Sequence, residues 1–82
     1  MSEKISDALI AKKEISIFRT SIVDKKGISQ IEKLLDFLIG KNEWNFDLED
    51  VDNILRIHAN PYVNGFLTQE LKKMGFECEE VF

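Results

Sequence analysis

Cysteine and long apolar runs are both scarce in this chain, and each shortage excludes a class of protein. The 82 residues include one cysteine, Cys78, so the chain cannot close a disulfide within itself. No apolar run approaches the roughly 20 residues that a membrane-spanning helix needs. Residues 1–13 lack the continuous apolar segment of a secretory signal peptide and carry Glu3 and Asp7. We therefore expect a cytoplasmic protein that does not bind membranes.

Basic charge is scarce too. Eleven Lys and Arg against fifteen Asp and Glu give a net charge of −4, and the pI is near 4.9. Nucleic acids and anionic membrane surfaces are bound by basic patches, so neither is an expected partner. The length, with 44% hydrophobic and 32% charged residues, predicts one small globular domain.

The stretch 44–59 alternates apolar and polar residues on both sides of a short acidic cluster. Such alternation is typical of a strand with one buried face, and two such strands around a tight connection form an antiparallel hairpin. The residues expected to face the core are Trp44, Phe46 and Leu48, then Leu55, Ile57 and Ala59. The turn is expected near 49–53.

A predicted helix lies on each side of the hairpin. The first has an apolar stripe at three- and four-residue spacing and ends before Gly40. Its stripe consists of Ile28, Ile31, Leu34, Leu35 and Leu38. The second begins at Asn60-Pro61, which is a good cap followed by a residue favoured in the first turn, and it ends at Gly75. Its apolar face consists of Phe66, Leu67, Leu71 and Met74.

Residues 14–23 and 76–82 are predicted as the first and the last strand of the chain. The resulting order, strand, helix, strand, strand, helix, strand, is the split βαβ pattern. It predicts an α+β fold, a ferredoxin-like βαββαβ two-layer sandwich. Two helices then cover one face of a four-stranded antiparallel sheet whose central strands are the first and third. The domain is expected to span 14–82, after a flexible N-terminal arm at 1–13.

Two segments carry a likeness to a known family. They are W-N-F-D-L-E-D-V-D-N-I-L-R-I at 44–57 and G-F-E-C-E-E at 75–80. On these, residues 14–82 resemble small bacterial heavy-metal-associated domains, which are similar in fold to copper chaperones, and in particular a branch without Cys-x-x-Cys. The family holds Cu(I) on two thiolates in the loop after its first strand. Here that loop, R-T-S-I-V-D-K-K-G at 19–27, contains no Cys, His or Met. The resemblance therefore implies the fold without a metal cofactor.

Cys78 and His58 are the remaining candidates for metal chemistry, apart from two methionines. A zinc site needs three or four protein ligands, so these two with Glu79 or Glu80 would form one only across a dimer. The sequence favours a buried structural cysteine and a solvent-facing histidine instead. A Cys–His nucleophile pair needs direct contact, which the predicted strand order does not provide, so we expect no enzyme.

The open sheet face is the predicted partner surface. If Ile15 and Ile17 face the helices, Phe18 faces outward, beside Ile54, Arg56 and His58 on the neighbouring strand. Apolar groups gathered on an exposed sheet often indicate an interface. The sequence thus predicts a non-catalytic binding module that contacts a protein partner or a second copy of itself. The alternative is metal-ion binding or transfer through Cys78 and His58.

Overall fold

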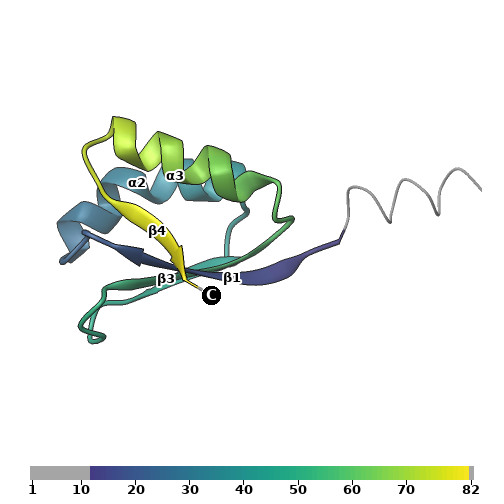
Figure 1. Cartoon of the computed structure of the whole chain (residues 1–82). Coiled ribbons are helices and arrows are strands. Elements are labelled where there is room, and N and C mark those ends of the chain that lie inside the picture. The colour runs from purple at the N-terminus through teal and green to yellow at the C-terminus, as the bar shows by residue number, and fades with distance from the viewer. Residues whose placement is uncertain (1–11, 82) are drawn as a thin grey trace, which may run out of the picture.

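Two helices cover one face of an antiparallel sheet in the computed structural model, which describes residues 12–81 (Figure 1). The predicted α+β class, with four strands and two helices, is confirmed for this part of the chain. Most of the arm predicted for 1–13 lies outside the described residues. The elements in order are β1 (Glu14–Thr20), α2 (Lys25–Leu38), β2 (Trp44–Asp47), β3 (Ile54–Ala59), α3 (Val63–Lys73) and β4 (Cys78–Val81).

The strands lie in the order β2-β3-β1-β4, so β1 and β3 are central, as the sequence predicted. All three pairings are antiparallel. β2 and β3 form the predicted hairpin, in which Phe46 is opposite Leu55. In its turn, Asp47 Oδ1 accepts hydrogen bonds from the main-chain N–H groups of Glu49 and Asp50, at 3.1 and 3.3 Å. The carboxylates of Asp47 and Asp50 thus hold the backbone of the turn, and Asp47 and Asp52 also lie within ion-pair distance of arginines on the neighbouring strands.

Local hydrogen bonds begin and end the helices. Asp24 caps α2, because its Oδ1 accepts from the N–H of Gly27 at 2.9 Å. α3 ends in a Schellman motif at Gly75, which has φ +94°, and the N–H of Phe76 donates to Leu71 O at 2.9 Å. α3 begins at Val63, later than predicted, and residues 61–62 before it form a turn in which Asn60 Oδ1 accepts from the N–H of Tyr62 at 3.0 Å.

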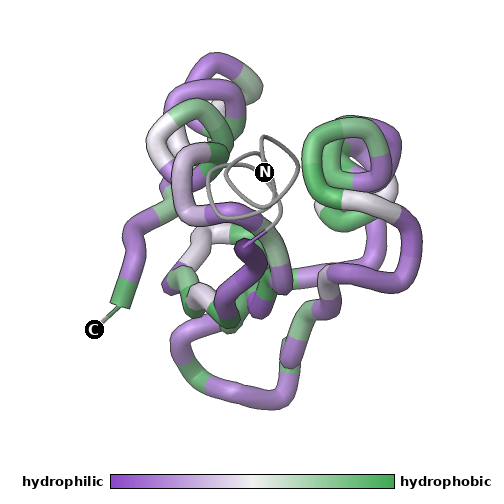
Figure 2. The backbone as a smooth tube through the Cα atoms, turned by 90° about the vertical axis from the view of Figure 1, so that its right-hand side faces the viewer, coloured by the Kyte–Doolittle hydropathy of each residue, from purple (hydrophilic) through white to green (hydrophobic). Residues whose placement is uncertain are grey.

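The core lies between the sheet and the helices, which the end-on view shows side by side (Figure 2). The hairpin residues Leu55, Ile57 and Ala59 are buried, as predicted. At the β2 edge, Trp44 Nε1 donates to Asp36 Oδ1 of α2 at 2.9 Å, which closes that side of the core. The largest fully buried side chains are Phe18, Ile22, Ile31, Leu35, Leu55, Ile57, Leu67 and Leu71.

The predicted orientation of β1 is wrong. Phe18 is fully buried against the helices, whereas Ile15 and Ile17 lie on the open face and are 65% and 36% exposed. Arg19 shares their side of the strand, and burying its guanidinium without a partner would be costly. Thr20 faces inward with Phe18, where its hydroxyl donates to Asn53 O at 2.8 Å. The inward side of β1 is therefore polar apart from one large aromatic ring.

Candidate functional site: the open sheet face

The sheet face opposite the helices is the candidate site. Residues that pair directly across antiparallel strands point to the same face, so the register identifies its members. They are Ile15, Ile17 and Arg19 of β1, Ile54, Arg56 and His58 of β3, Asn45 and Asp47 of β2, and Glu79 and Val81 of β4. The structure thus places three of the four predicted partner residues on this face, and Phe18 on the opposite side of the sheet.

Ile15 and Ile17 form an apolar stripe along the central strand β1. Ile17 is flanked by Val81 on one side and by Arg56 on the other. Ile54, although predicted as a contact residue, is only 8% exposed. The exposed apolar surface at the centre of the sheet therefore comes from the two β1 isoleucines, which the sequence reasoning had directed inward.

The two arginines of the face differ in how firmly they are held. Arg19 Nη1 hydrogen-bonds Glu79 Oε1 at 3.5 Å, and its Nε lies 3.7 Å from Asp52 Oδ1. Arg56 Nη2 has one ion pair, at 3.9 Å from Asp47 Oδ2, which is too long for a hydrogen bond. Both side chains are about half exposed, so these pairs contribute little to stability. Arg56 therefore has fewer and longer polar contacts than Arg19.

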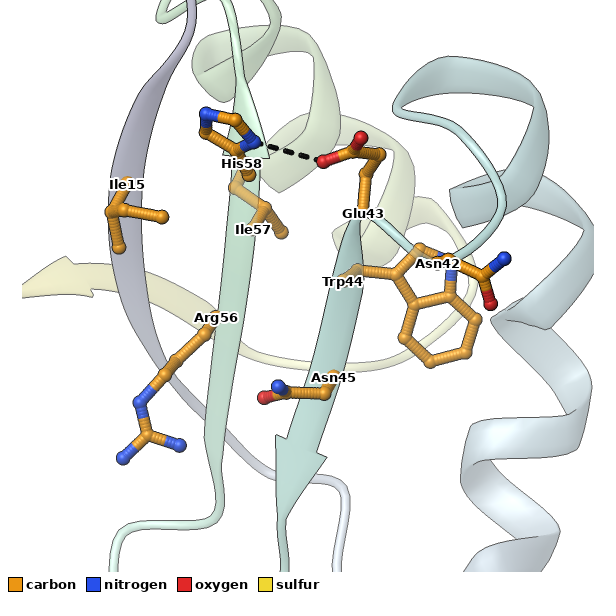
Figure 3. A pocket seen from close by; sticks show the side chains of 8 residues that line it. All are labelled: Ile15, Asn42, Glu43, Trp44, Asn45, Arg56, Ile57 and His58. Carbon is orange, nitrogen blue, oxygen red and sulfur yellow. Dashed lines mark hydrogen bonds and ion pairs between the residues drawn. The ribbon is translucent and has the colours of Figure 1, made fainter.

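A shallow groove with a volume of about 300 Å³ runs across this face near the start of β1 (Figure 3). Asn45 and Arg56 are directly opposite each other on β2 and β3, and Ile15 lies on the β1 side. The groove thus joins donor groups to an exposed aliphatic side chain. Its lining residues are Ile15, Asn42, Glu43, Trp44, Asn45, Arg56, Ile57 and His58.

His58 and Glu43 form the tightest polar contact in the groove. His58 Nδ1 lies 2.9 Å from Glu43 Oε2, and the main-chain N–H of His58 donates to Glu43 O at 2.8 Å. Lys13 Nζ lies 3.7 Å from the other carboxylate oxygen. The hydrogen bond from His58, followed by the charge of Lys13, lowers the pKa of the Glu43 carboxyl below its ordinary value. His58 is therefore oriented by a carboxylate that stays ionised.

Cys78 and His58 are not brought together. Cys78 is buried on the helix-facing side of β4, while His58 lies on the open face of β3, and β1 separates the two strands. Burial raises the pKa of the Cys78 thiol to about 12, so it is neutral at pH 7 and a poor nucleophile or metal ligand. Within residues 12–81, no cluster of three or more His, Cys, Asp or Glu is arranged to hold a metal ion.

The loop after β1, where the resembled family holds its metal, is closed by its own hydrogen bonds. Thr20 Oγ1 bridges Asn53 O and the N–H of Ile22. Ser21 Oγ accepts from the N–H of Glu77 at 2.8 Å, and Asp24 caps α2. The polar side chains of this loop are therefore engaged in hydrogen bonds to the backbone.

No protein family, curated protein or solved structure matches this chain. Among residues 12–81, neither helix has the length and apolar character required to cross a bilayer.

Sequence reasoning missed Ile15, Ile17 and Asn45 as members of the candidate site. The position of Arg19 was the available signal for the isoleucines, because a charged residue two positions from Ile17 marks the exposed side of a strand. Asn45 had no such signal, since its neighbours depend on the register between β2 and β3. Its place in the groove comes from the three-dimensional pairing.

Proposed function

We propose that residues 14–82 form a non-catalytic interaction module that binds a protein partner, or a second copy of the chain, through the open sheet face. The observation that carries this proposal is the exposure of Ile15 and Ile17, 65% and 36%, in the middle of a sheet face. The open face of an antiparallel sheet is ordinarily polar where it meets water. Apolar groups that are ringed by charges resemble the centre and rim of a protein interface.

The fold assignment is part of the same proposal. The element order and the sheet order β2-β3-β1-β4 support a ferredoxin-like architecture. The likeness to heavy-metal-associated domains without Cys-x-x-Cys is retained as a proposal on the segments 44–57 and 75–80. The hydrogen-bonded loop after β1 supports a role without copper transfer. The single cysteine, held as a buried thiol, supports a cytoplasmic location.

The test compares two exposed apolar sites, one on the sheet and one on a helix. Ile15→Thr/Ile17→Thr removes the apolar stripe and keeps strand-forming residues. Phe37→Ser is the matched control, because Phe37 is 86% exposed on α2, in the layer that covers the opposite face of the sheet. Circular dichroism first establishes that both variants fold.

Two measurements then decide the proposal. Sedimentation over a wide concentration range measures self-association, and affinity capture from cell extract identifies bound proteins. We expect an association or a captured protein that the isoleucine variant loses and Phe37→Ser retains. A chain that stays monomeric and captures the same proteins in all three forms contradicts the proposal.

A further inference from the structure

We infer that the partner of the open face is a protein segment that presents a carboxylate beside aliphatic side chains. Its carboxylate binds Arg56 and Asn45, and its aliphatic groups lie on Ile15 and Ile17. This inference rests on the proposed function and specifies the chemistry of the partner. It is carried by the unused hydrogen-bond donors of the groove and by their place next to the apolar stripe.

The guanidinium of Arg56 has hydrogen-bond donors that the described residues leave unused. A guanidinium has five N–H groups, and within residues 12–81 that of Arg56 makes no hydrogen bond and one ion pair of 3.9 Å. Its side chain is 45% exposed, so an incoming group reaches it without a large rearrangement. Arg19, on the same face, is held by Glu79 and Asp52. Carboxylates bind the planar fork of arginine through two parallel hydrogen bonds, which a neutral amide does not match.

Asn45 adds a neighbouring donor. It is exposed, it pairs directly with Arg56 across β2 and β3, and its side-chain amide has no hydrogen-bond partner among the described residues. The Cβ atoms of directly paired residues lie about 5 Å apart. Figure 3 shows both side chains on the groove side of the two strands. A single carboxylate thus meets donors from two strands.

The apolar stripe is adjacent to these donors. Ile17 pairs directly with Arg56, and Ile15 pairs with His58 one step along the same strands. When an aliphatic side chain of the partner packs on these two isoleucines, the residues next to it in the partner lie over Arg56. Two carboxylates limit the affinity: Asp47 competes for Arg56, and Glu43 lies in the groove, although it is engaged by His58. We expect a short peptide to bind only in the millimolar range.

The test uses two blocked pentapeptides that differ in one group. The acidic probe is Leu-Ala-Asp-Ala-Leu and the control is Leu-Ala-Asn-Ala-Leu, both acetylated and amidated, so in an extended form the first, third and fifth side chains share one face. Each is titrated into the ¹⁵N-labelled full chain and followed by amide chemical shifts. We expect the acidic probe to shift residues 15, 17, 45 and 56 with saturation, and the control to bind about two- to fivefold more weakly.

Variants separate this inference from the proposed function. Arg56→Gln should weaken the acidic probe about two- to fivefold and remove the preference over the control. Lys33→Gln, which removes an exposed positive charge from α2, in the layer on the other side of the sheet, should change neither. Equal binding of both probes at the open face overturns the carboxylate preference and leaves the interaction module intact. Shifts confined to other surfaces, or shifts that depend on protein concentration without peptide, overturn the inference, and the latter assigns the face to a second copy.

Discussion

Asn64 of α3 donates a hydrogen bond from its Nδ2 to Ser16 Oγ of β1, over 3.0 Å and between two buried residues. The other amide atom, Oδ1, has no hydrogen-bond partner among residues 12–81. This polar pair fastens the second helix to the central strand. It also helps to explain why β1 turns Ser16 inward and leaves Ile15 and Ile17 on the open face. The orientation of the proposed interface therefore depends on a contact inside the core.

Removal of one member of this pair should be more damaging than removal of both. Ser16→Ala leaves both polar ends of the Asn64 amide buried without a protein partner, which should lower the free energy of unfolding by about 1–3 kcal/mol. Adding Asn64→Leu replaces the amide by an apolar group of similar size and should recover part of that loss. Urea denaturation of the wild type, both single variants and the double variant measures the coupling. Strictly additive losses contradict it.

Two helical glycines should respond oppositely to alanine. A Cβ on Gly27 would lie 2.9 Å from Ile22 Cγ2 in the buried turn before α2, so Gly27→Ala should lower the free energy of unfolding by about 1–3 kcal/mol. A Cβ on Gly65 in α3 meets nothing within 4 Å, so Gly65→Ala should stabilise by up to about 1 kcal/mol. Thermal or urea denaturation of the pair checks the sign. Stabilisation by both substitutions would show that the loop before α2 has room to relax.

The hairpin was predictable because Arg56 and His58 separate Leu55, Ile57 and Ala59, which leaves these apolar residues one inward side even though Ile54 adjoins Leu55. β1 was not, because apolar residues at 15, 17 and 18 fit either orientation. The deciding contact joins Ser16 to Asn64, which lies 48 positions away. The same limit applies to the site. The sequence of β3 alone predicted that Arg56 and His58 share a face. The residues that lie beside them on β1 and β2 follow from the register between the strands.

The buried thiol of Cys78 should make stability fall at alkaline pH. Its pKa rises from an ordinary value of 9.0 to about 12 because burial disfavours the thiolate. Between these values the unfolded chain releases the proton and the native chain keeps it, so the free energy of unfolding decreases, by up to about 1.4 kcal/mol per pH unit. Cys78→Ala removes this dependence, and the difference between the two stability curves from pH 8 to 11 isolates it. Parallel curves, or fast labelling of the native thiol at pH 8, contradict a buried Cys78.

The Glu43 carboxylate should show the opposite pH dependence. The hydrogen bond from His58, and then the charge of Lys13, lower its pKa from the ordinary value of 4.5. The unfolded chain therefore takes up the proton first as the pH falls. Stability from this contact is complete above about pH 4.5 and is lost as the pH falls through the lower native pKa. Glu43→Gln should flatten the decrease in melting temperature between pH 6 and 3. Glu32→Gln is the matched control, since Glu32 is exposed on α2 and makes no ion pair within residues 12–81, and it should leave the decrease unchanged. If both variants follow the wild type, the His58–Glu43 contact does not persist in solution, and the groove loses its only hydrogen-bonded pair of side chains among the described residues.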